Sequence, residues 1–177
     1  EANTQKGSFA LLRLDGVMRS RDGMSTQGIS TLIGDLRAAN QNDNIDGILI
    51  EANTGGGEVT AGQMLLSAIE QSPKAVVVYA HFLASGGVMG TLAADEIIAS
   101  GPQARIGSIG TYVTLDKTIG NWYSRYYEEI YADKSTNKNA DWRAYLRGDY
   151  GPIRNMVNKT NDTFLEQVMT YRELRGD

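Results

Sequence analysis

Cysteine is absent from the 177-residue sequence, and histidine occurs once, at His81. The missing cysteine excludes disulfide bonds, thiolate nucleophiles and cysteine metal ligands. A single histidine also excludes a histidine-rich metal site. We therefore expect neither a metal nor a cofactor.

Long apolar runs and a basic excess are missing too. No stretch approaches the roughly 18 apolar residues that identify a transmembrane helix. Seventeen Lys and Arg stand against 21 Asp and Glu, giving a formal net charge of −4. The sequence thus predicts no membrane span and no nucleic-acid partner.

The N-terminus lacks the basic, apolar and small-residue order of a signal peptide and begins with Glu1 instead of Met. This predicts a processed or excised soluble piece. The residues do not choose between a membrane-anchored envelope protein and a phage-encoded cytoplasmic protein as its source.

Apolar segments alternate between strand-like and helix-like patterns. Strands are expected at 8–14, 46–52 and 75–80, and the apolar run at 75–80 is typical of a strand buried on both faces. Apolar residues spaced three and four apart predict helices near 29–36 and 61–69. This alternation predicts an α/β fold.

Shorter strands are expected at 96–99, 104–106 and 129–132, and a small-residue helix follows Ser85 as far as Ala94. A terminal helix is expected at about 153–172, with inward-facing residues Ile153, Met156, Val157, Thr160, Phe164 and Val168. We predict one domain over 1–177, with 1–7 loose and a polar loop at 18–25.

Ser85 has the setting of a nucleophile. It follows a buried strand and precedes Gly86, Gly87 and the small-residue helix. A strand-to-helix turn exposes a side chain at the sheet edge, and the helix start offers unpaired N–H groups to a developing oxyanion. The structural alternative is that Ser85 caps a helix in a tight turn.

A second glycine cluster, Asn53–Gly57, also lies between a strand and a helix. In a parallel sheet both turns fall at the carboxyl edge, so Gly56 and Gly57 can face Ser85 and supply a second oxyanion donor. The alternatives are a phosphate-binding loop or an ordinary turn. Glu58-Val59 stands where a Walker motif needs Lys-Ser/Thr.

Histidine and lysine are the residue types considered as the base that would activate Ser85. His81 lies only four residues before the serine and is expected to be a core or crevice-lining residue. The remaining candidate base at neutral pH is a lysine. Burial would lower the pKa of such a lysine and so keep its amine uncharged. Composition does not identify which lysine this is.

Three motifs, at residues 53–59, 83–87 and 107–110, together resemble those of the signal peptide peptidase A family of Ser–Lys proteases. Asn53-Thr54-Gly55-Gly56-Gly57-Glu58-Val59 is similar to the family's N-[ST]-P-G-G-x-V loop, although Gly55 replaces proline. Leu83-Ala84-Ser85-Gly86-Gly87 resembles the nucleophile segment, and Gly107-Ser108-Ile109-Gly110 resembles a later turn.

The resemblance implies a Clp/crotonase-like fold of repeated ββα units, with a mainly parallel sheet flanked by helices. It also implies a general-base lysine a little over fifty residues after the serine. Lys138, 53 residues after Ser85, fits better than Lys134, although Asn137 replaces the aromatic or histidine residue before the lysine. The family's usual downstream segment is absent, which we interpret as truncation, native processing or an unusual member. Because one half carries both the serine and the lysine, the chain resembles the short single-domain members, which include phage proteases.

The implied activity is peptide-bond hydrolysis by a Ser85–Lys138 dyad, with Ser108 holding the lysine. Gly57 and Gly86 would form the oxyanion hole. The residues expected to bind the peptide are Gly55, Gly56, Leu83, Val88 and Met89. The expected substrates are signal peptides, membrane-protein fragments or phage capsid and scaffold proteins. A homo-oligomeric ring or dome is implied as well. Two alternatives stay open: a catalytically silent assembly subunit, and a crotonase-type acyl-CoA enzyme using Glu58.

Overall fold

The computed structural model describes residues 7–23 and 28–172. They form two compact units: unit 1 holds the described residues of 1–109 and 164–177, and unit 2 is residues 110–163. The single domain over 1–177 stays a prediction. Apart from Gly7, the segment expected to be loose lies outside the described residues, as does part of the polar loop at 18–25.

Unit 1 alternates strands and helices along the chain, as the apolar pattern predicts. Its complete elements, in order, are β1 (Phe9–Met18), α1 (Ile29–Gln41), β2 (Gly47–Gly57), α2 (Val59–Glu70), β3 (Ala75–Ala84), α3 (Gly86–Thr91), β4 (Glu96–Ala99) and β5 (Arg105–Gly107). The strands form one sheet in the order β1-β2-β3-β4, and β5 also pairs with β3. Every pairing is parallel, which confirms the predicted α/β class.

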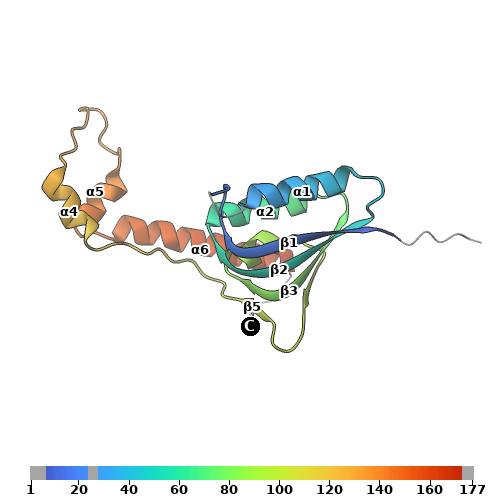
Figure 1. The fold of residues 1–177 in the computed structure, drawn as a ribbon. Helices are drawn as coiled ribbons and strands as arrows, with labels where there is room; N and C mark the ends of the chain where they lie inside the picture. The colour runs from blue at the N-terminus through green and yellow to red at the C-terminus, as the bar shows by residue number, and fades with distance from the viewer. Residues whose placement is uncertain (1–6, 24–27, 173–177) are drawn as a thin grey trace, which may run out of the picture. The chain divides into compact units, whose positions relative to one another are not determined.

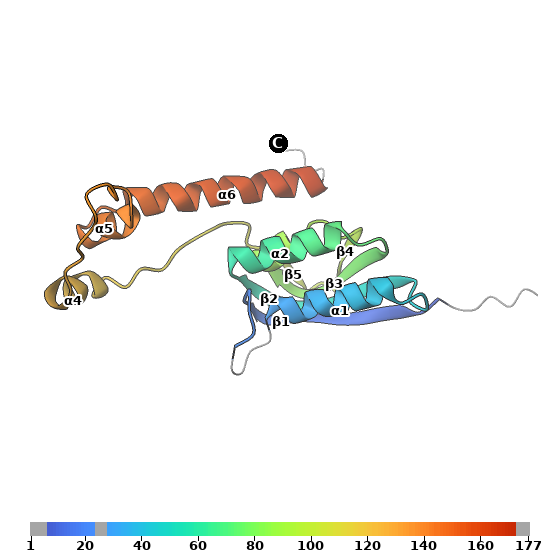
Figure 2. The ribbon, with the colours of Figure 1, turned by 90° about the horizontal axis from the view of Figure 1, so that it is seen from above.

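Helices cover one face of this sheet. Figures 1 and 2 show α1 and α2 side by side over the strands. Alternate strand residues such as Ile48, Ile50 and Val78 are buried beneath them. Because successive strand side chains point to opposite faces, Val77 and Tyr79 lie on the other face, where they are only half-buried. The expectation that this strand is buried on both faces is therefore wrong.

Helix α6 (Gly151–Arg172) joins the two units, and its last part packs in unit 1. Only Phe164 and Val168 are buried among the residues expected to face inward. Met156, for example, is 54% exposed. The predicted helix is confirmed. The prediction of which residues face inward is wrong for the first half of the helix, where none of the named side chains is buried.

Phe164 should stabilise unit 1 strongly, since its ring is 1% exposed and belongs to the main hydrophobic cluster. We expect Phe164→Ala to lower the free energy of unfolding by about 3–5 kcal/mol, because the substitution leaves a cavity. Urea denaturation measures the change. The neighbouring Leu165 is 42% exposed, so Leu165→Ala should cost below about 1 kcal/mol. Equal losses in the two variants would contradict the packing of α6.

Unit 2 contains α4 (Ile119–Tyr126), α5 (Ala140–Leu146) and the first part of α6. Aromatic contacts hold it together: the Trp142 ring meets the Tyr123 ring edge-on at 5.3 Å and the Tyr145 ring at 5.3 Å. The strand expected at 129–132 is wrong. This segment is irregular, and the Tyr123 and Tyr131 hydroxyls donate hydrogen bonds to the Glu129 carboxylate.

Candidate active site

The glycine cluster at 53–57, which the sequence places after a strand at 46–52, is in the structure the last part of strand β2. The strand runs as far as Gly57, which pairs with Met18 of β1. The backbone of Gly56 has φ +88°, a left-handed conformation that favours glycine. The predicted loop is therefore a bent strand end, which we call the glycine turn (residues 55–57).

Ser85 lies at the junction of β3 and α3, with φ 50° and ψ −118°. This left-handed backbone is strained for a residue with a side chain, and such strain is concentrated at functional sites. The Ser85 N–H donates a hydrogen bond to the Gly107 carbonyl at 3.0 Å. The strained conformation is thus tied to the end of a neighbouring strand.

The glycine turn and the Ser85 segment lie in direct contact. A Cβ atom on Gly56 would lie 2.6 Å from the Gly86 nitrogen and 3.0 Å from the Ser85 Cβ. A Cβ atom on Gly86 would lie 3.1 Å from the Gly57 nitrogen. The expected meeting of the two turns at one sheet edge is confirmed, and side chains at Gly56 or Gly86 would force them apart.

Ser108 lies beside Ser85 in unit 1. Ala84 pairs with Gly107 in the register of β3 and β5, so the two serines directly follow paired residues. Ser108 is exposed and also has a left-handed backbone, with φ 55°. Both candidate serines therefore stand at the carboxyl ends of adjacent parallel strands.

Leu83, Val88 and Met89 are buried in the main core cluster; Met89, for example, is 2% exposed. They lie next to Ser85 in the chain, but their side chains pack against the core. Their role in substrate binding stays a prediction, since they would have to move to line a pocket.

Lys138 belongs to unit 2, whereas Ser85 belongs to unit 1. Lys138 is exposed, as is Lys134. Lys138 lines a hollow of unit 2 together with Glu129, Tyr131 and Ser135, among other residues. Hydrogen bonds from Tyr131 first and Tyr123 second lower the pKa of Glu129, so a carboxylate lines the same hollow as the amine. The pairing of Lys138 with Ser85 stays a prediction.

His81 lies on the open face of the sheet. Its Nε2 is 3.2 Å from a carboxylate oxygen of Glu51, whose other oxygen is 3.5 Å from Arg13 Nε. The Tyr79 ring meets the imidazole edge-on at 5.3 Å. With its side chain 45% exposed, His81 is not a core residue, and its expected alternative, a crevice-lining position, stays a prediction.

Glu58 anchors the segment that follows β1. Its carboxylate accepts a hydrogen bond from the Ser20 N–H at 2.8 Å, and its own N–H donates to the Met18 carbonyl at 3.0 Å. The backbone hydrogen bond from Ser20 is the main reason that the pKa of Glu58 lies below its usual value. This contact links residues 18–20 to the glycine turn and occupies the carboxylate considered for acyl-CoA chemistry.

Sequence reasoning gave no role to Thr54. Its buried hydroxyl accepts a hydrogen bond from the Gly56 N–H and donates one to the Gly16 carbonyl. The available signal was a threonine directly before a glycine cluster, although the same letters also describe an ordinary turn.

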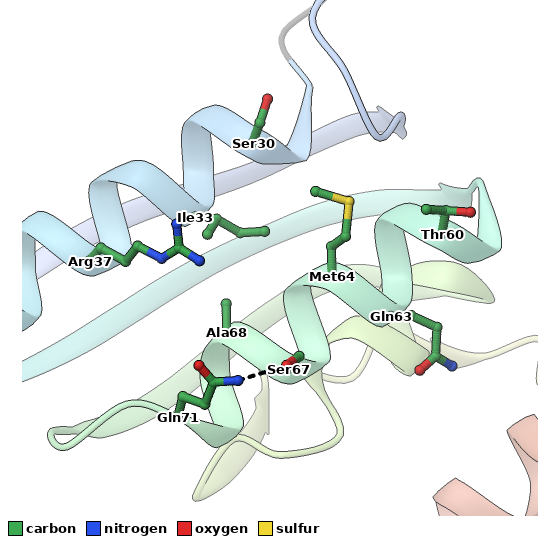
Figure 3. A pocket seen from close by; sticks show the side chains of 9 residues that line it. All are labelled: Ser30, Ile33, Arg37, Thr60, Gln63, Met64, Ser67, Ala68 and Gln71. Atoms are coloured by element: carbon green, nitrogen blue, oxygen red, sulfur yellow. Dashed lines mark hydrogen bonds between the residues drawn. The ribbon is translucent and has the colours of Figure 1, made fainter.

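A separate groove lies between α1 and α2 (Figure 3). Ile33 and Met64 lie within it, and Arg37 is the charged residue among those that line it. None of the residues expected at the active site lines this groove. Among residues 7–23 and 28–172 there is also no cluster of three metal-ligating side chains. Within the same ranges, no helix is both long and apolar enough to cross a membrane.

Comparison with known proteins gives one curated relative of clear similarity. It is a protein of Methanocaldococcus jannaschii named "putative protease", which is 31% identical over an aligned length of 143; the match covers 76% of this chain and 44% of the relative. The chain thus spans less than half the length of this relative. No family model matches the chain.

A solved structure shares the fold over about two thirds of this chain. A mutant of a membrane-bound stomatin-specific protease is 22% identical, with a TM-score of 0.51 over 68% of this chain and 61% of that one. ClpP1 from Listeria monocytogenes is 25% identical, with a TM-score of 0.42 over 48% of this chain and 46% of that one. The chain has a Clp-like α/β fold, with a mainly parallel sheet flanked by helices.

Proposed function

We propose that this chain is the catalytic part of a serine endopeptidase in which Ser85 is the nucleophile and Lys138 the general base. The observation that carries the proposal is the strained backbone of Ser85, held against the glycine turn at the carboxyl edge of the sheet. Sequence similarity to a protein named as a protease supports the reaction class.

The chemistry follows the acyl-transfer scheme. In this proposal the Lys138 amine acts as general base and takes the proton of Ser85 as the serine Oγ forms a bond to the scissile carbonyl carbon. The N–H groups of Gly57 and Gly86 stabilise the oxyanion. The lysine then gives the proton to the leaving amine as the C–N bond breaks, and water hydrolyses the acyl-enzyme. In this scheme Ser108 orients the lysine.

The substrate in this proposal is an extended peptide that lies beside Gly55 and Gly56. Backbone groups of the glycine turn would form strand-like hydrogen bonds with such a peptide. Candidate substrates are signal peptides, fragments of membrane proteins, and phage capsid or scaffold proteins. The membrane proteins considered include stomatin-like proteins. The proposal includes assembly of the chain into a homo-oligomer.

A fluorophosphonate probe tests the nucleophile without a known substrate. Trypsin cleaves after Lys74 and Arg105 and so separates Ser85 from Ser108. We expect mass spectrometry to locate the probe on Ser85 within the peptide 75–105, and prior unfolding to prevent the reaction. A folded chain that stays unlabelled would contradict the proposal and favour the silent assembly subunit.

A further inference from the structure

Thr54 is one of two buried polar residues in the described part of the chain, at 1% exposed; the other is Thr91. The Thr91 hydroxyl bonds to the Gly87 and Val88 carbonyls of its own helix, as is common for threonine in helices. The Thr54 hydroxyl instead connects two strands. It donates to the Gly16 carbonyl of β1 at 2.5 Å and accepts the Gly56 N–H of β2 at 3.0 Å.

The methyl group of Thr54 makes a third contact. A Cβ atom on Gly87 would lie 2.6 Å from the Thr54 Cγ2, so the methyl packs directly against the first turn of α3. At the other contact, Gly16 has φ +72° and lies where the register between β1 and β2 shifts. One buried side chain therefore joins an irregular point in β1, the glycine turn and the helix that follows Ser85.

These contacts bear on the N–H groups that the proposed mechanism uses. Gly57 directly follows the residue that Thr54 holds, and its nitrogen is 3.1 Å from the position of a Cβ on Gly86. A shift of the glycine turn would move the Gly57 N–H relative to the Ser85 hydroxyl. An error of about 1 Å in such a geometry can cost about 100-fold in rate.

We infer that Thr54 is a positioning residue that fixes the glycine turn against the Ser85 segment, and this inference rests on the proposed function. The hydroxyl sets the turn through Gly56 and Gly16, while the methyl sets its spacing from α3. Valine would keep the shape and remove both hydrogen bonds. Serine would keep the bonds and remove the methyl.

The test measures how fast a fluorophosphonate labels Ser85, with the maximal rate constant separated from probe affinity. We expect Thr54→Val to lower the rate constant by about 10- to 100-fold, with affinity changed less than about threefold. Thr54→Ser should recover most of the rate. Thr91→Val is the matched control, since Thr91 is equally buried and its hydroxyl bonds only within α3, so its labelling should match the wild type.

A merely structural role would lower the amount of protein that can be labelled and leave the rate constant of the folded fraction unchanged. That result, or wild-type labelling by Thr54→Val, would overturn the inference while leaving the proposed function intact.

If the wild type itself is not labelled, the proposed function fails, and amide hydrogen exchange then decides the role of Thr54. The Gly56 amide should exchange at least about tenfold faster in Thr54→Val, because its acceptor is gone. Unchanged protection of Gly56 would overturn the positioning role.

Discussion

Ser85→Ala should abolish peptide-bond hydrolysis, because it removes the oxygen that attacks the carbonyl and leaves the fold in place. We expect activity on a fluorescently labelled unfolded protein to fall by about four orders of magnitude or more. The methyl group of alanine fits the half-buried site, so circular dichroism and the free energy of unfolding should change little. Wild-type activity in this variant would refute the nucleophile.

The two exposed lysines of unit 2 provide a matched pair for the base. Lys138→Ala should lose activity to a similar extent, because residues that act together are strongly non-additive. Lys134→Ala removes the same side chain four residues earlier and should keep wild-type activity. The reverse result, with loss only at Lys134, would move the base to that residue and leave Ser85 as nucleophile.

Much of unit 1 is predictable from sequence because its patterns have a direct physical cause. Ile48 and Ile50 point to the helix-covered face because strand side chains alternate between the two faces. Leu32 and Leu36 are buried on the same side of α1 because they lie about one helical turn apart. The meeting of Ser85 and the glycine turn follows from the rule that parallel strands end at one edge. Neither inference needs long-range information beyond strand order.

Other features depend on partners that no local pattern reveals. Residues 53–57 have the composition of a loop, yet pairing of Gly57 with Met18 keeps them in β2. The residues Ile130, Tyr131 and Ala132 after Glu129 suggest a strand, but two tyrosine hydroxyls hold the segment in an irregular form, and Ile130 is 93% exposed. His81 follows an apolar run, although its charged partner Glu51 lies on the neighbouring strand β2.

The placement of the base is the part of the site that sequence reasoning reached only through family spacing. Residues 110–163 form a unit of two short helices, the first part of α6, irregular segments and aromatic contacts. The proposed nucleophile and oxyanion donors therefore lie at the sheet edge of unit 1, whereas the proposed base lies in unit 2. The lysine variants accordingly test the proposal at its most informative point.

Gly56→Ala should be the most damaging single-methyl change near the site. The new Cβ would lie 2.6 Å from both the Ala84 oxygen and the Gly86 nitrogen, backbone atoms that cannot rotate away. Alanine is also strained at φ +88°. We expect the free energy of unfolding to fall by at least about 1–3 kcal/mol from the strain alone. Fluorophosphonate labelling should slow by about 100-fold or more, because the turn must separate from Ser85.

Alanine substitutions at two other glycines serve as controls, because they add the same methyl group away from the close contact with Ser85. A Cβ atom on Gly55 would meet the Phe82 ring at an ordinary 3.5 Å, so Gly55→Ala should change the free energy of unfolding by less than about 1 kcal/mol. Gly34 lies in α1 with open space around it, and Gly34→Ala should stabilise the chain by about 0.5–1 kcal/mol with labelling unchanged. If Gly56→Ala matched these variants in stability and labelling, the close contact between the glycine turn and Ser85 would be wrong. The oxyanion hole built on that contact would then have to be abandoned, whichever lysine serves as the base.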